Sequence, residues 1–188
     1  MNLSLRTLSV AAMLTVASIG GAIAQDNPEV GGAAMYADKN IVENAVNSAD
    51  HTTLVAAVQA AGLVETLSGP GPFTVLAPVN AAFDALPAGT VETLLKPENK
   101  ETLSTILACH VIPAKALSTD IVGMVEADGG EHVVDTVGGC KLTLKAADGK
   151  VTVTDENGTV ANVTIADVIQ SNGVIHVIDA VLTPKSAM

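Results

Sequence analysis

"SNGVIHVIDAVLTP", Ser171 to Pro184, is apolar almost throughout and yet contains a histidine and an aspartate. Its branched apolar residues predict a buried strand. Residues three apart on a strand point to opposite faces, so His176 and Asp179 are poorly placed to act together as a catalytic pair. We therefore expect a buried, hydrogen-bonded imidazole at His176 and a carboxylate at the sheet surface at Asp179.

Further strands are expected between Glu131 and this segment. The stretches "HVVDTV", "CKLTLKA" and "KVTVTDENGTVANVTIADVIQ" alternate or run apolar. The turn dipeptides Gly138-Gly139, Asp148-Gly149 and Asn157-Gly158 separate them. Apolar alternation broken by such dipeptides is typical of antiparallel hairpins.

Helical spacing dominates the chain before these strands. Two apolar stripes at helical intervals predict two short helices, one with Ile41, Val42, Ala45 and Val46, the other with Leu54, Val55, Val58 and Ala61. Gly62 is expected to end or bend the second helix. "GPFTVLAP", Gly71 to Pro78, then predicts a buried strand between prolines.

A second helical region runs from Val79 to Ile112. Asn80 and Thr90 are candidate N-caps, and Pro97 suits a first helical turn. His110 shares a face with three apolar residues, Leu103, Ile106 and Leu107. Helices first and hairpins afterwards predict an α+β domain, with N-terminal helices packed on an antiparallel β-sheet.

The two ends of the chain differ from this pattern. Residues 1–24 contain Arg6, an apolar run and then "AIA", the order of a signal peptide that is cleaved after Ala24. The run is too short for a comfortable membrane span, so no membrane anchor is expected. We expect a secreted or periplasmic protein with a linker over 25–39, one domain over 40–184 and a tail over 185–188.

Composition excludes several kinds of partner. The chain carries 9 basic and 20 acidic residues, a formal charge of -11 at pH 7. This charge opposes binding to phosphate backbones, so nucleic acid is not expected as a partner. With no Trp, one Tyr and two Phe, the chain also lacks aromatic platforms for stacking bases or sugars.

Two cysteines, Cys109 and Cys140, are 31 positions apart. This separation fits neither a zinc knuckle nor a C-x-x-C redox motif, and in an exported chain it favours a disulfide. The alternative makes Cys109 a nucleophile with His110 as its base. Neighbours in sequence rarely point at each other, and no third orienting group is identifiable.

The other polar residues show no catalytic pattern. The four histidines have neither H-x-x-x-H nor H-x-H spacing, so no metal site is expected. Many carboxylates fall in turn sequences such as "ADGK" and "TDENGT". We therefore expect no cofactor and no enzymatic activity.

Three separated blocks together resemble the fasciclin domain. "GPFTVLAPVNAAFDALP" resembles its first conserved block, "CHVI" its tyrosine-histidine segment and "SNGVIHVIDAVLTP" its second block, in the family's order. The matching positions include Asn80, His110, Asn172, Gly173 and His176, which the resemblance makes structural. The family's usual tyrosine is Cys109 here, so no role of that phenol carries over.

This resemblance implies an adhesion or interaction module. Its partner would be a cell-surface or matrix protein, or a second copy of the chain. In fasciclin domains of animal matrix proteins an Asp-Ile pair is implicated in integrin recognition, and the matching pair here is Asp167-Val168. In the alternative interpretation of this pair, Asp167 shapes a turn and Val168 packs inward. A small-ligand carrier, or an enzyme with an unrecognised site, is the other functional class.

Overall fold

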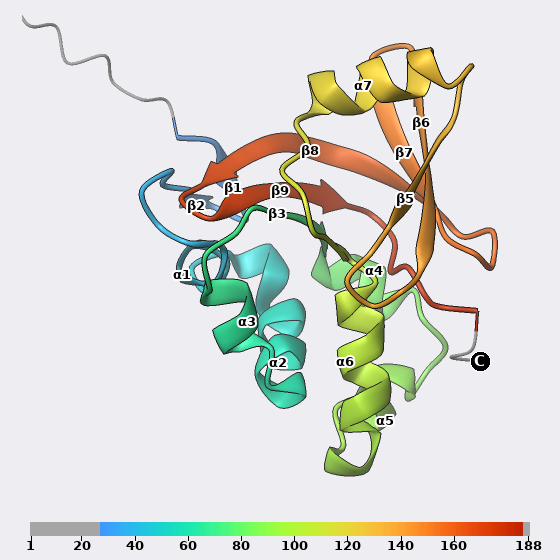
Figure 1. The fold of residues 1–188 in the computed structure, drawn as a ribbon. Helices are drawn as coiled ribbons and strands as arrows, with labels where there is room; N and C mark the ends of the chain where they lie inside the picture. The colour runs from blue at the N-terminus through green and yellow to red at the C-terminus, as the bar shows by residue number, and fades with distance from the viewer. Residues whose placement is uncertain (1–26, 186–188) are drawn as a thin grey trace, which may run out of the picture.

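The structure of the protein is a computed structural model that describes residues 27–185 (Figure 1). Its helices lie mainly in the first half of the chain. They are α1 (Ile41–Ala45), η1 (Ala49–His51), α2 (Thr52–Ala61), α3 (Val64–Ser68), α4 (Asn80–Asp84), α5 (Thr90–Leu94), η2 (Pro97–Asn99), α6 (Lys100–Ala108) and α7 (Ser118–Ala127).

Seven strands form the main sheet. They are β3 (Phe73–Pro78), β4 (Val111–Ile112), β5 (His132–Asp135), β6 (Lys141–Ala147), β7 (Lys150–Thr154), β8 (Val160–Gln170) and β9 (Gly173–Ile178). Their order across the sheet is β4-β3-β9-β8-β7-β6-β5. The α+β class is confirmed. The sheet, however, is mixed, because β3 pairs with β9 in parallel while the other pairs are antiparallel.

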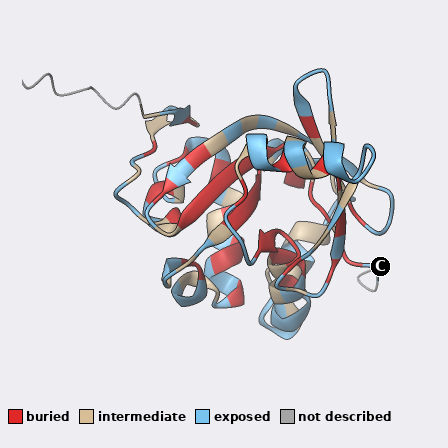
Figure 2. Ribbon diagram, turned by 45° about the horizontal axis from the view of Figure 1, so that its top comes forward, coloured by how far each residue is buried: buried red, intermediate tan, exposed pale blue. Residues whose placement is uncertain are grey.

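The neighbouring strands β3 and β9 are buried on both faces, as Figure 2 shows in red. One face packs against α2 and α6, and this core includes Val75 and Val177. The opposite face belongs to a second core with α7, β6 and β7, which includes Leu76 and Ile178. Burial on both faces explains why "GVIHVI" is apolar without alternation.

The hairpins follow the predicted turns. The β6–β7 turn is made by Asp148 and Gly149, whose φ angles of 52° and 74° are both positive. Two consecutive positive φ values fit a type I′ turn, for which Asp-Gly is favoured. Gly62 ends α2 in the left-handed conformation, with φ 74°.

The stretch from residue 27 to 39, expected to be part of a linker, is instead built into the domain. A two-stranded ladder, β1 (Glu29–Val30) and β2 (Ala33–Ala34), forms there. Val30 and Met35 are both buried in the helical core. The burial of these two apolar side chains stabilises an ordered segment, although the Gly and Pro residues around them favour turns. The predicted signal peptide and the last residues of the tail lie outside the described residues.

Helix α7 was not expected, since no element was assigned between Pro113 and Gly130. It buries Ile121 and Val125, four residues apart, against β6 and β7. Only this short apolar stripe marks it in the sequence. In Figure 1, α7 lies across the sheet from α2 and α6.

Asn80 does not cap its own helix. It is the first residue of α4, and its side chain reaches α2 instead. The Oδ1 atom accepts a hydrogen bond from the Thr53 N–H at 3.0 Å, while Nδ2 donates to the Ala49 carbonyl at 2.9 Å. Asn80 thus supplies the N-terminal cap of α2 from a distant part of the chain.

Candidate functional site

Asp167 holds the start of α7 against β8. It lies at an irregularity of β8, between Ile165 and Val168, with a positive φ of 58°. Its carboxylate accepts hydrogen bonds from the Ser118 N–H, at 2.6 Å, and from the Ser118 hydroxyl. A carboxylate at the first turn of a helix satisfies a free N–H and complements the helix dipole.

His176 connects this corner to the centre of the sheet. Its Nδ1 accepts from the Asp167 N–H at 3.2 Å, and its Nε2 donates to the Ala116 carbonyl at 2.9 Å. The imidazole is buried, which lowers its pKa, and the Ala116 carbonyl and Asp167 only partly oppose that effect. His176 therefore joins α7, β8 and β9 as a neutral side chain.

His110 performs a similar role on the other side of β3. Its Nδ1 donates to the Ile106 carbonyl at 2.8 Å, and its Nε2 accepts from the Leu182 N–H at 2.9 Å. Burial lowers its pKa to about 4, against smaller raising effects of the Ile106 carbonyl and Asp155. The imidazole fastens α6 to the segment that follows β9.

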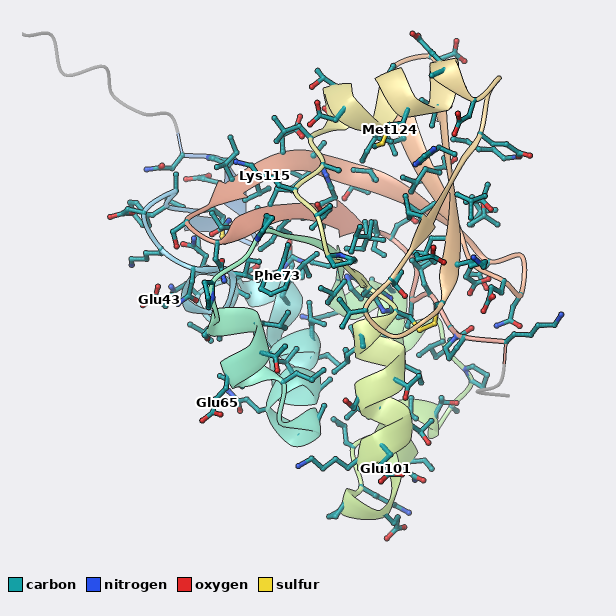
Figure 3. The ribbon with its side chains drawn as sticks, in the orientation of Figure 1. Glu43, Glu65, Phe73, Glu101, Lys115 and Met124 are labelled. Carbon is teal, nitrogen blue, oxygen red and sulfur yellow. A yellow bond between two sulfur atoms is a disulfide. The ribbon has the colours of Figure 1, made fainter. Side chains whose placement is uncertain are left out.

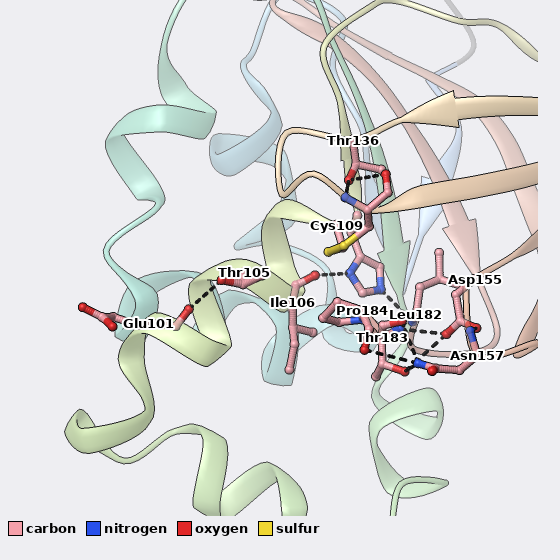
Figure 4. Close-up of a disulfide and its surroundings, with 12 residues drawn as sticks. Glu101, Thr105, Ile106, Cys109, Thr136, Asp155, Asn157, Leu182, Thr183 and Pro184 are labelled. Carbon is pink, nitrogen blue, oxygen red and sulfur yellow. Dashed lines mark hydrogen bonds between the residues drawn. A yellow bond between two sulfur atoms is a disulfide. The ribbon is translucent and has the colours of Figure 1, made fainter. Parts of the chain in front are cut away.

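A disulfide involves Cys109, the residue before His110, and Figure 4 shows its surroundings. Cys109 and Cys140 are bonded, with their Cα atoms 5.4 Å apart. Cys109 follows α6 and Cys140 precedes β6, so the bond joins the helical part of the domain to the outer hairpins. A cysteine in a disulfide offers no thiolate, which removes the nucleophile from the proposed Cys109–His110 pair.

Asn172 and Gly173 join the helices to the start of β9. The Asn172 side chain accepts from the Ile41 N–H at 3.1 Å and donates to the carbonyls of Leu67 and Gly69. Gly173 lies so close to β3 that a Cβ atom there would be 2.1 Å from the carbonyl oxygen of Phe73. In this geometry Asn172 links the helices to the start of β9, and Gly173 allows β9 to lie close to β3.

The surface near the end of β8 exposes apolar side chains. Ile169 and Tyr36 are each 43% exposed, and the Lys39 ammonium lies 4.9 Å from the Tyr36 ring centroid. The Tyr36 loop is fixed to this strand end because the Asn44 side chain bonds both the Tyr36 backbone and Gln170. We call Tyr36, Lys39 and Ile169 the Tyr36 surface.

Neither a metal-binding cluster nor a membrane-spanning helix is found among the described residues. Nowhere in residues 27–185 do three His, Cys, Asp or Glu side chains gather closely enough to hold a metal ion. None of the helices in this range is long and apolar enough to cross a membrane.

A sequence model of the Fasciclin domain matches residues 49–184. The chain belongs to the fasciclin domain family. The protein sll1483 of Synechocystis sp. is 48% identical over 172 residues, which cover 92% of this chain and 88% of sll1483. The transforming growth factor-beta-induced protein ig-h3 of Sus scrofa is 40% identical over 133 residues, covering 71% of this chain and 17% of ig-h3.

A solved structure supports the same fold. This fasciclin domain matches a FAS1 domain pair from the insect cell adhesion molecule fasciclin I with a TM-score of 0.70. The match covers 79% of this chain and 52% of the insect chain, at 16% identity. This likeness establishes the architecture of helices on a mixed sheet.

The two residues of the expected partner-binding pair have different surroundings in this fasciclin domain. Val168 is fully buried and has no surface to offer a partner, since it packs in the helical core. Asp167 is half-buried and its carboxylate is bonded to Ser118. The alternative given for this pair, a shaped turn with an inward valine, describes the geometry. An irregularity in β8 between Ile165 and Val168 decides that Val168 faces the core. Nothing in the sequence "IADVIQ" predicts this irregularity.

Asp179 lies at the surface, as expected. Its carboxylate accepts from the Asn162 backbone N–H at 2.7 Å and from the Asn162 side chain at 2.8 Å. Its hydrogen bonds go to Asn162, whereas those of His176 go to Asp167 and Ala116, so the two side chains do not bond each other. No pattern in the sequence indicated the Tyr36 surface or the hydrogen-bonded pair of Ser48 and His51.

Proposed function

We propose that this fasciclin domain is a secreted, non-catalytic interaction module that binds a cell-surface protein through the Tyr36 surface. The observation that carries the proposal is the exposure of Tyr36 and Ile169 on a rigidly held strand end. Aromatic side chains dominate the binding energy of many protein interfaces, and a neighbouring lysine supplies a charge for partner selection.

The family relationship supports the class of function. The domain resembles parts of ig-h3 and an insect cell adhesion molecule. The side chains of Asn80, His110, Asn172 and His176 are all hydrogen-bonded between elements of the fold, which supports a structural role for them rather than acid–base chemistry. The proposed contact lies beside the position of the animal Asp-Ile pair, with Ile169 in place of the buried Val168.

A binding assay with matched variants tests the proposal. Labelled protein is added to intact cells of the source organism, before and after trypsin treatment of the cells. Trypsin is expected to abolish binding, and Tyr36→Ser combined with Ile169→Thr to weaken it at least tenfold, since a hot-spot residue contributes about 2 kcal/mol or more. The control is Val160→Thr, because Val160 is also exposed on β8 but lies at its other end.

The outcome separates two errors. If the double variant binds as the natural protein does, with an unchanged melting temperature, the Tyr36 surface is not the contact. If no cell-bound protein is found for any form, the adhesion role itself is wrong.

Secretion is tested independently by mass spectrometry of the exported protein. The expected N-terminus is Gln25, because "AIA" places small residues at the two positions that signal peptidase reads. A retained Met1 would contradict export through signal-peptide cleavage near Ala24.

A further inference from the structure

A narrow cavity lies between the helices and the sheet, on the face covered by α1, α2 and α3. Its volume is about 50 Å³. The lining is apolar apart from Ser48, His51, Gln59 and His110. Both ring nitrogens of His110 are already hydrogen-bonded, and Gln59 is exposed. The polar character of the interior therefore depends on Ser48 and His51.

His51 presents an unsatisfied nitrogen to this cavity. The side chain is 3% exposed, and its Nδ1 lies 2.8 Å from the Ser48 hydroxyl. Its Nε2 is buried and makes no hydrogen bond of normal distance and angle, although the Ala77 carbonyl interacts with the ring. A buried polar atom without a partner costs about 1 to 3 kcal/mol, so an occupant that bonds Nε2 would recover stability.

The pair is held firmly in this position. The turn between β1 and β2 covers Ser48 so tightly that a Cβ atom on Gly31 would be 2.4 Å from the Ser48 hydroxyl oxygen. The Ala49 N–H also donates to the Gly31 carbonyl at 3.2 Å. His51 therefore keeps its orientation without help from an occupant.

The shape of the cavity follows one face of α2. His51, Leu54, Val55, Val58 and Gln59 all line it, at the spacing of a single helical face. From His51 to Gln59 this face extends about 12 Å, at about 1.5 Å per residue. Gln59 is exposed and Val55 is half-buried, so the Gln59 end reaches the surface.

We infer that this cavity binds a slender, neutral, apolar molecule with one hydroxyl group, whose hydroxyl bonds the His51 Nε2 and whose chain extends towards Gln59. A hydroxyl fits because it both donates and accepts, and so suits either tautomer of the Ser48–His51 pair. The enclosed volume is about one third of the 150 Å³ known to admit benzene, so only the hydroxyl end of the molecule is enclosed and the rest of its chain lies along the open Gln59 end.

An anionic head group fits less well. The chain carries a net charge of -11, and Glu43 and Glu65 point outward from α1 and α3 beside this face (Figure 3). Burial lowers the pKa of His51 more than the Ala77 carbonyl and Asp50 raise it, so the imidazole is neutral at pH 7. The residues that line the cavity include no Lys or Arg that could pair with a buried carboxylate.

The test is a titration of the full chain, with labelled Val, Leu and Ile methyl groups, monitored by nuclear magnetic resonance. Butanol, hexanol and octanol are compared with octane and octanoate. Saturable shifts are expected at Val55 and Val58, with affinity rising by at most about fourfold per methylene, the value for a fully buried methylene. Octane and octanoate should bind at least tenfold more weakly than octanol.

Three variants locate the site. His51→Leu should reduce octanol binding to the level of octane. Ala45→Leu narrows the cavity from α1 and should also weaken octanol binding tenfold. The control, Val46→Leu, changes the neighbouring residue, which is 51% exposed and does not line the cavity. It should leave octanol binding unchanged.

Each contrary result overturns the inference. Shifts that do not saturate would mean that only water occupies the cavity. Equal binding of octane and octanol, or unchanged octanol binding by folded His51→Leu, would remove the role of Nε2. An unaffected Ala45→Leu variant would place the binding elsewhere.

Discussion

At the scale of the residue, the buried histidines show how polar side chains are accommodated in an apolar core by hydrogen bonds. His110 and His176 each use one ring nitrogen as a donor and the other as an acceptor. This arrangement requires the neutral imidazole, because a protonated ring has no acceptor. The stability of the domain therefore depends on the protonation of these rings.

His110 makes the domain sensitive to acid. Its pKa is about 4 in the folded protein, against 6.5 in the unfolded chain. Between these values the unfolded state binds the proton more readily, so stability is full above pH 6.5 and falls as the pH drops towards 4. At about 1.36 kcal/mol per unit, this residue alone should remove about 3 kcal/mol of unfolding free energy.

Urea unfolding at pH 7 and pH 4 measures this loss. The His110→Gln variant is the comparison, because glutamine also donates and accepts but does not titrate. Its stability should fall less than that of the natural protein over the same interval. Equal losses in the two proteins would show that other groups cause the acid sensitivity.

Asp167 should act as a structural residue. Asp167→Ala removes both hydrogen bonds to Ser118, and the loss of a helix cap typically costs about 1 kcal/mol. Asp167→Asn keeps an acceptor and should cost less. Thermal unfolding of the two variants checks the order. If both melt like the natural protein, the carboxylate does not stabilise α7.

At the scale of the element, the contact between β3 and β9 depends on a missing side chain. Gly173→Ala would force a Cβ atom to within 2.1 Å of the Phe73 carbonyl oxygen, and backbone cannot yield cheaply. We expect a loss of about 3 kcal/mol, the upper part of the usual range for overpacking.

Gly123→Ala is the matched control. Gly123 is exposed within α7, and a Cβ atom there meets nothing within 4 Å. Alanine should stabilise this helix by about 0.5 to 1 kcal/mol. Chemical unfolding of both variants gives the comparison. A Gly173→Ala protein as stable as the natural one would show that β3 and β9 can separate without cost.

The sequence largely predicted the individual helices and strands, but it did not predict the parallel pairing of β3 with β9. The apolar run of β9 and the Asp148-Gly149 turn are local signals, and both predicted their structures. The parallel pairing of β3 with β9 joins Phe73 to Gly173, 100 positions apart. An apolar run indicates burial on both faces but does not say which strand lies alongside.

The same limit applies to the sites. His110 was expected in the core because it shares a helical face with apolar residues, and the structure confirms this. The orphaned Nε2 of His51 results from the packing of several elements, and neither its lone position nor its spacing indicated it. Val168 was expected to contact a partner, but the irregularity in β8 turns its side chain into the core.

At the scale of the whole molecule, the disulfide links the two sides of the sheet. Reduction of Cys109–Cys140 frees a loop of 31 positions, which corresponds to about 3 to 4 kcal/mol in the chain-entropy model. Urea unfolding with and without reductant should show this loss. The double variant Cys109→Ala and Cys140→Ala should match the reduced protein and be indifferent to reductant.

The central position of β9 also determines when the domain can form. β9 is the last strand in the described chain, yet it lies between β3 and β8. The sheet cannot form completely until β3 and β9, which are 100 positions apart in the sequence, have come together. Strand pairings between such distant segments slow folding towards the millisecond-to-second range. We proposed above that this chain is exported across a membrane. Slow closure of the sheet would keep the chain unfolded, and so able to cross, until β9 has been made.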